Sequence, residues 1–95
     1  MPNNQTPDEM IKLHTDQWVR RSEYNKVVEA VRRFLPSMRP KHSYPVETMV
    51  GQAIWSKGSK RRTGAIIAHA VRYKELPLRF ANNGKRATKL YELDV

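Results

Sequence analysis

Between residues 22 and 35 the apolar positions repeat with the period of an α-helix. Six of them stand at i, i+3, i+4, i+7, i+10 and i+11: Tyr24, Val27, Val28, Val31, Phe34 and Leu35. This spacing forms one continuous apolar stripe with charged residues on the other side, so the sequence predicts an amphipathic helix. Ser22 is expected to cap its start, and Pro36 to end it, because the residue before a proline disfavours helical backbone.

A second helix is expected at about residues 45–56. Pro45 suits a helix start, and the apolar residues after it repeat the helical spacing: Val46, Met49, Val50, Ala53 and Ile54. Lys57 and Gly58 end this helix and begin a tight turn. Residues 36–45 contain three prolines, which predicts an irregular connector with room for a short extended segment.

A third helix is expected at about residues 60–75, where Ser59 is a good N-cap. Its apolar residues allow two different buried faces. One stripe consists of Gly64, Ile67, Ala68 and Val71, and the competing stripe consists of Ile66, Ala70 and Tyr73. Periodicity alone leaves both faces open.

After Glu75 the apolar period changes from 3.6 to 2, which is typical of β-strands. The alternating residues form two sets: Leu76, Leu78 and Phe80, then Tyr91, Leu93 and Val95. Asn83 and Gly84 between them suit the positive φ angles of a hairpin turn. The chain is therefore expected to end in a β-hairpin, and the fold class is α+β, mainly helical.

The N-terminal segment also carries a helix-start pattern. Thr6 is followed by Pro7 and, three residues after Thr6, by Glu9. A short helix to about Asp16 is expected, and its few apolar residues require it to dock on the body or on a second copy of the chain. We therefore divide the chain into an extension, residues 1–21, and a domain, residues 22–95.

Charge is distributed unevenly along the chain. Residues 57–89 hold ten of the eighteen basic residues and one acid, Glu75, so this stretch carries +9, which equals the formal net charge of the whole chain. Such a concentration predicts a polyanionic partner. DNA or RNA is favoured over an anionic membrane, because the charges do not line one face of an amphipathic helix.

Composition narrows the class of protein further. The 95 residues include no cysteine, so neither a disulfide framework nor a thiolate zinc site is available. No apolar run approaches a membrane span of about 20 residues, and the first residues lack the features of a signal peptide. A cytoplasmic protein is expected, nucleoid-associated if bacterial.

The predicted order is helix, connector, helix, tight turn, basic helix, strand, basic loop, strand. Over residues 22–95 this order resembles a winged helix-turn-helix domain, in which the C-terminal hairpin is called the wing. The resemblance implies that residues 59–74 enter a DNA major groove and that residues 82–88 touch the backbone or the minor groove. The closing residues 88–93 resemble the last strand of such domains, in which a Tyr and a Leu return to the core.

The chemistry of the basic helix supports DNA binding independently of this resemblance. A helix N-terminus offers free N–H groups and a partial positive charge to phosphate, and an arginine there can pair with guanine. Long cations on a thin loop suit phosphates or a narrow minor groove. The candidate DNA-binding residues are Ser59, Lys60, Arg61, Arg62, Thr63, His69, Asn82, Lys85, Arg86 and Lys89.

Each feature also has a simpler interpretation. A basic run is often only a solvated face, and Lys85 and Arg86 can simply keep a hairpin tip soluble. The sequence offers no case for an enzyme, a cofactor, a metal site or a small-molecule ligand, because the acids are scattered and the three histidines lack ligand spacing.

The sequence predicts a protein that binds double-stranded DNA sequence-specifically, as a small transcriptional regulator of the kind common in bacteria, phages and plasmids. A replication, partition or recombination accessory factor would use the same surface. A winged-helix module that docks on an acidic protein is a different alternative, and RNA binding is disfavoured by the lack of an aromatic sheet face. The sequence leaves the oligomeric state open, and residues before Ser22 are the candidate interface of a homodimer. The target sequence and the sign of regulation stay open.

Overall fold

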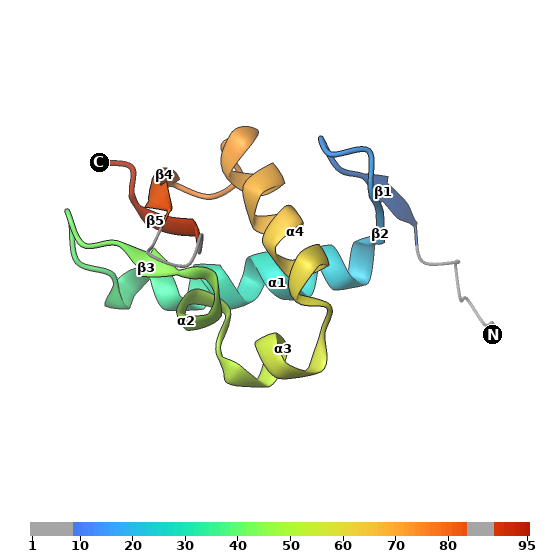
Figure 1. The fold of residues 1–95 in the computed structure, drawn as a ribbon, viewed down its shortest axis with the longest axis horizontal. Helices are drawn as coiled ribbons and strands as arrows, with labels where there is room; N and C mark the ends of the chain where they lie inside the picture. The colour runs from blue at the N-terminus through green and yellow to red at the C-terminus, as the bar shows by residue number, and fades with distance from the viewer. Residues whose placement is uncertain (1–8, 84–88) are drawn as a thin grey trace, which may run out of the picture.

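The computed structural model of the chain describes residues 9–83 and 89–95 and has an α+β fold (Figure 1). The elements follow one another as β1 (Met10–Lys12), β2 (Trp18–Arg20), α1 (Arg21–Phe34), a 3-10 helix η1 (Leu35–Ser37), β3 (Tyr44–Pro45), α2 (Val46–Val50), α3 (Gln52–Lys57), α4 (Lys60–Arg72), β4 (Leu78–Asn83) and β5 (Lys89–Leu93). None of the helices in the described ranges is long and apolar enough to cross a membrane.

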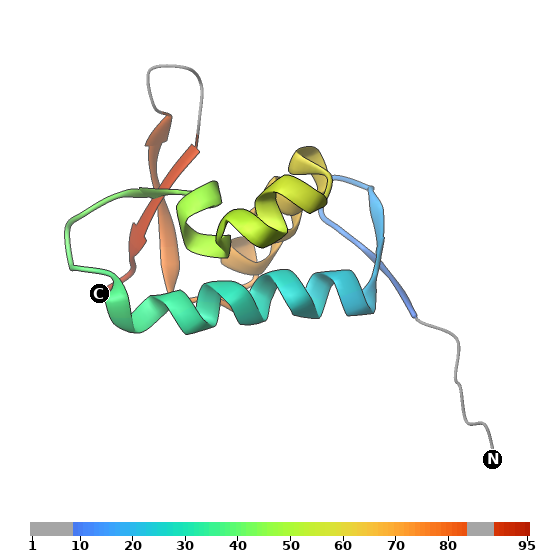
Figure 2. The same ribbon diagram turned by 90° about the horizontal axis from the view of Figure 1, so that it is seen from below.

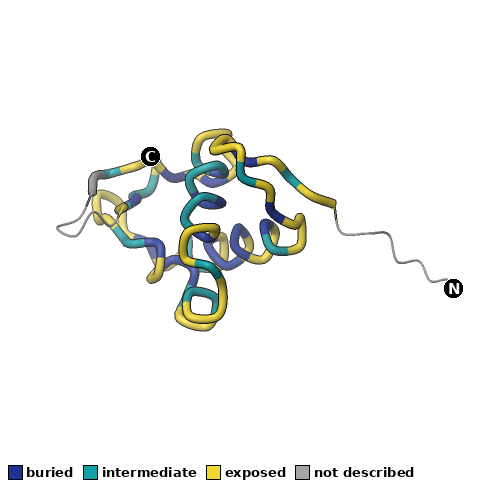
Figure 3. Tube along the Cα trace, turned by 45° about the vertical axis from the view of Figure 1, so that its right-hand side comes forward, coloured by how far each residue is buried: buried dark blue, intermediate teal, exposed yellow. Residues whose placement is uncertain are grey.

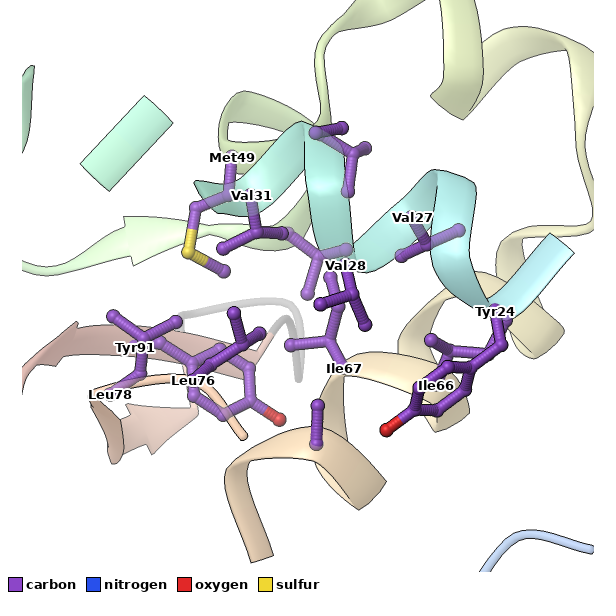
Figure 4. Packing of buried hydrophobic residues seen from close by; sticks show 14 of the residues in the cluster. Tyr24, Val27, Val28, Val31, Met49, Ile66, Ile67, Leu76, Leu78 and Tyr91 are labelled. Atoms are coloured by element: carbon purple, nitrogen blue, oxygen red, sulfur yellow. The ribbon is translucent and has the colours of Figure 1, made fainter. Parts of the chain in front are cut away.

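Helix α1 confirms the predicted amphipathic helix and forms the base of the core, but the predicted cap is wrong: the N-cap is Arg20, without a side-chain hydrogen bond, and Ser22 lies in the first turn. Four residues of its stripe, Tyr24, Val27, Val28 and Val31, are buried. Side chains from α2, α4 and the C-terminal strands converge on this stripe in one cluster (Figure 4). Along the trace, buried positions lie where the helices face inward, and exposed positions follow the outer turns (Figure 3).

Helix α4 buries a face that lies between the two predicted stripes. Ile66, Ile67 and Ala70 are each 0% exposed, so both adjacent isoleucines point into the core. Tyr73, from one predicted stripe, is exposed, and Ala68, from the other, is only partly buried. The helix ends at Arg72, because Lys74 takes a positive φ of 61° and Glu75 N–H turns back to the carbonyl of Ala70 at 2.8 Å.

The C-terminal hairpin is confirmed and belongs to a three-stranded antiparallel sheet. Strand β5 lies in the centre, between β3 and β4. Tyr91 of β5 is opposite Tyr44 on one side and Phe80 on the other, and its ring is buried. A shift in register between Phe80 and Asn82 marks a bulge in β4. The predicted turn at Gly84 lies outside the described residues.

The predicted helix reaching Asp16 is wrong, because β1 and β2 form an antiparallel hairpin in its place. Ile11 pairs with Val19 in the middle of the two strands. Asp16 adopts a left-handed φ of 67° in the turn, and Leu13 N–H donates to the carbonyl of Gln17 at 2.8 Å. Leu13 and Val19 are each 2% exposed and join the core. Burial of these two apolar side chains outweighs the local helix-start signal.

The predicted single helix over residues 45–56 is also wrong, because it divides into α2 and α3 at Gly51. Gly51 has a φ of 87°, which ends the helical backbone and turns the chain. The prediction of its buried face holds for α2, where Val46, Met49 and Val50 are buried, while Ala53 of α3 is exposed.

The elements place α4 in the middle of one face of the molecule. In Figure 1, α4 crosses in front of α1, with α2 and the three-stranded sheet on its left and the β1–β2 hairpin on its right. The view from below shows α1 as the opposite face of the molecule (Figure 2). Helix α4 is therefore flanked on both sides by β structure.

Candidate nucleic-acid interface

The N-terminus of α4 is capped as the sequence predicts. The Ser59 hydroxyl accepts a hydrogen bond from Arg62 N–H at 3.2 Å, and the Ser59 carbonyl accepts one from Thr63 N–H at 2.9 Å. The side chain of Ser59 therefore serves the helix itself. The first turn holds three cations and no acid, so side-chain charge adds to the partial positive charge of the helix start.

The two adjacent arginines of this turn have different surroundings. Arg62 is held against α1, where its Nε lies 3.0 Å and 3.2 Å from the two carboxylate oxygens of Glu23. Arg61 is exposed and makes no ion pair with any residue that the structure describes. Arg62 thus joins two helices, whereas Arg61 is available to a ligand.

A groove of about 520 Å³ runs over the outer face of α4, and we call it the α4 groove. Small residues of α4 form part of its surface: Gly64, Ala65 and Ala68. Lys60 and Arg61 line it at the start of α4, and Lys89 of β5 lines its edge on the side of the three-stranded sheet. Glu47 is the one acid among the lining residues that the structure describes, so the surface keeps an excess of positive charge.

Lys60 also contacts an aromatic ring beside this groove. Its Nζ lies 5.7 Å from the centre of the Trp55 ring of α3, within the range of a cation–π interaction. Trp55 itself lines the groove and is partly buried. The ring therefore supports the ammonium group at the edge of the groove.

Two predicted site residues point away from the groove. Thr63 is 1% exposed, so its side chain cannot reach a ligand in this structure. His69 packs among three rings, with ring centres 5.7 Å from His14, 5.9 Å from Tyr24 and 4.6 Å from Tyr73. Its Nδ1 accepts a hydrogen bond from the backbone N–H of His14 at 2.9 Å. Burial, and secondarily the neighbouring His14, lowers the pKa of His69, which favours the neutral ring.

The predicted residues of the C-terminal loop are placed only in part. Asn82 pairs with Leu90 in the β4–β5 ladder, and Lys89 begins β5 as an exposed residue. Lys85 and Arg86 lie outside the described residues. Of the predicted site, the structure brings together Lys60, Arg61 and Lys89.

The sequence prediction missed one wall of the α4 groove. His14, Thr15 and Gln17, from the turn between β1 and β2, line the side opposite Lys89. The polar run from His14 to Gln17, set between Leu13 and Trp18, is a turn signal that we overlooked in favour of the helix-start pattern at residues 6–9.

Two further contacts fix the C-terminal end of α4. The Tyr24 hydroxyl donates a hydrogen bond to the Glu75 carboxylate, and Arg32 of α1 donates to the Glu75 carbonyl at 3.3 Å. Burial, and then the contact with Glu75, raises the pKa of the Tyr24 phenol. Both ends of α4 are thus anchored to α1, which holds the groove in one orientation.

The α4 groove has the chemistry of a surface for a polyanion: exposed cations at its edges, small side chains in its middle and a rigid helix beneath. Comparison of the chain with protein-family models, with curated proteins and with solved structures gave no match.

Proposed function

We propose that this chain binds double-stranded DNA sequence-specifically through α4 and regulates transcription by occupying its site. The order of elements from α1 to β5 supports a winged helix-turn-helix architecture, with α3 and α4 as the helix pair and β4–β5 as the wing. The central position of β5 between β3 and β4 is compatible with the same architecture.

The observation that carries the proposal is the outer face of α4. This face combines the exposed cations Lys60 and Arg61 with small residues over the next two turns. A B-form major groove, about 12 Å wide, admits an α-helix, whereas the deep and narrow major groove of A-form RNA does not. The short side chains of Gly64, Ala65 and Ala68 allow such a helix to approach base edges closely.

Within this proposal, the residues divide into two roles. Arg61 is suited to guanine O6 and N7 or to a phosphate, because its guanidinium is a planar fork of donors. Lys60, at the start of α4, and Lys89, at the edge beside the three-stranded sheet, suit phosphates of the backbone that borders the groove. Arg62 has a structural role through Glu23.

Selection of bound duplexes from a random DNA pool tests the proposal. We expect the wild-type protein to enrich one motif, whose symmetry reports whether one or two copies bind. The double variant Lys60→Ala/Arg61→Ala should retain its fold and enrich nothing, and on the selected duplex its binding should depend less on salt, with the log–log slope smaller by about 2.

Two results would contradict the proposal. One is the absence of duplex binding by the wild-type protein at low salt. The other is recovery of a protein partner, in a pull-down with nuclease treatment, whose binding Lys60→Ala/Arg61→Ala abolishes. The second result would identify the α4 groove as a docking surface for an acidic protein.

A further inference from the structure

The turn between β1 and β2, residues 13–17, is fixed against α4. The backbone N–H of His14 donates to Nδ1 of His69 on α4 at 2.9 Å. On the inner side of the hairpin, Leu13 and Val19 are each 2% exposed and belong to the core. The hairpin therefore extends the folded body beside α4, on the side away from the three-stranded sheet (Figure 1).

The turn is also ordered internally. Leu13 N–H donates to the Gln17 carbonyl at 2.8 Å, and Asp16 N–H donates to the Leu13 carbonyl at 2.9 Å. Asp16, the acid of the turn, forms an ion pair with Lys12 at 3.4 Å. Because these contacts are already formed in the free protein, binding of a ligand costs little conformational entropy in the turn.

The side chains that the turn presents to the α4 groove are hydrogen-bonding groups without negative charge. His14, Thr15 and Gln17 line the groove on this side, facing Glu47 and Lys89 across α4. An imidazole, a hydroxyl and an amide each donate hydrogen bonds to phosphate oxygens. The groove thus has donors on both of its sides and cations at the start of α4.

We propose that the β1–β2 turn is a second flanking contact to the DNA backbone, on the side of α4 opposite the wing. This inference rests on the proposed function. Nucleic acid is the occupant that the charges favour, because the groove lining holds Lys60, Arg61 and Lys89 against Glu47. In a symmetric dimer through this groove, a second copy of the chain would bring the same excess of cations against these cations.

Tethered cleavage tests the placement of the turn. The chain has no cysteine, so Thr15→Cys and Glu47→Cys each create a single attachment point for an iron chelate, one on each side of α4. Asn25→Cys, on the exposed face of α1, is the control. On an end-labelled duplex carrying the selected motif, we expect the first two proteins to cut opposite flanks of the site and the control to cut neither.

A pair of matched charge changes tests contact as well as proximity. Thr15 and Asn25 are both exposed, so Thr15→Glu and Asn25→Glu each add one negative charge without disturbing the core. We expect Thr15→Glu to weaken binding about tenfold relative to Asn25→Glu, because the new carboxylate faces phosphate. Circular dichroism and thermal denaturation should give the same profile for both variants.

The outcomes separate this inference from the proposed function. If the wild-type protein binds and Glu47→Cys cuts, but Thr15→Cys does not, the turn lies off the DNA and the inference is wrong while the function stands. Equal affinity of the Thr15→Glu and Asn25→Glu variants for the duplex would also show that the turn does not contact DNA, while the proposed function stands. If the wild-type protein sediments as a dimer and the Thr15→Glu variant sediments as a monomer, the turn is an interface between copies and the inference is wrong. Failure of the wild-type protein to bind any duplex removes both proposals.

Discussion

Replacing Arg61 and Arg62 separately by alanine gives the sharpest test of the interface, because the two variants lose the same charge from adjacent positions. Arg62 contacts both carboxylate oxygens of Glu23 at 3.0 and 3.2 Å, with the two side chains 44% and 26% exposed. Partly exposed ion pairs contribute about 0.5 to 1 kcal/mol. Arg62→Ala should therefore lower the melting temperature by about 2 to 8 °C in a chain of this length.

Arg61→Ala should have the opposite profile. Arg61 is exposed and makes no ion pair with the described residues, so its removal should change the free energy of unfolding by less than about 0.5 kcal/mol, and the melting temperature by no more than about 2 to 4 °C. On the selected duplex, loss of a base contact should cost about 1 to 3 kcal/mol of binding free energy.

Fluorescence anisotropy with the labelled duplex, combined with thermal denaturation, measures both quantities. The single variant Glu23→Ala and the double variant Glu23→Ala/Arg62→Ala complete a cycle that isolates the ion pair from other effects of truncation. Equal loss of affinity in the Arg61→Ala and Arg62→Ala variants would refute the reasoning. It would mean that affinity depends only on net charge, and that the ion pair with Glu23 does not keep Arg62 from contacting DNA.

Three other predictions concern the fold. Gly64→Ala should stabilise the chain by about 0.5 to 1 kcal/mol in denaturant titration, because an added Cβ meets open space and alanine favours helix. Ile67→Ala should cost about 2 to 5 kcal/mol, since Ile67 is 0% exposed, whereas Val95→Ala at the exposed end should cost almost nothing. Because the pKa of His69 lies below its usual 6.5, the unfolded chain binds more protons below that pH, so the free energy of unfolding should fall as pH drops from 6.5 through the lowered pKa. His69→Asn, which retains an acceptor for His14 N–H, should flatten this dependence in denaturant titrations across that range.

The periodic patterns of residues 22–35 and of residues 76–95 predicted α1 and the C-terminal hairpin correctly. The six-residue stripe of α1 needs no tertiary information, because one helical face is apolar and the other charged. The Ser59 cap and the alternation around Leu78 and Tyr91 are equally local. Phe34 and Leu35, the last two residues of the stripe, are the exceptions: both are only partly buried, Leu35 lies in η1, and Phe34 meets Tyr44 edge to face, with ring centres 5.4 Å apart.

The features that the sequence did not predict depend on tertiary packing. Whether Gly51 continues a helix or breaks it depends on where α2 and α3 must dock, since glycine adopts either backbone. The N-terminal hairpin is stabilised by burial of Leu13 and Val19 in the core, and a local sequence pattern does not show this contribution to the free energy of folding. Likewise, Arg61 and Arg62 are indistinguishable until the position of Glu23 on α1 is known.

The ring of Trp55 beneath Lys60 has a spectroscopic consequence. The chain has two tryptophans, and Trp18, which is 56% exposed on the outer side of the N-terminal hairpin, can be replaced by phenylalanine to leave Trp55 as a single intrinsic fluorophore. An ammonium group 5.7 Å from an indole alters the electric field on its excited state, so movement of Lys60 toward a phosphate should shift the emission of Trp55. The protein thus carries its own optical reporter of events in the α4 groove, readable in stopped flow without a label.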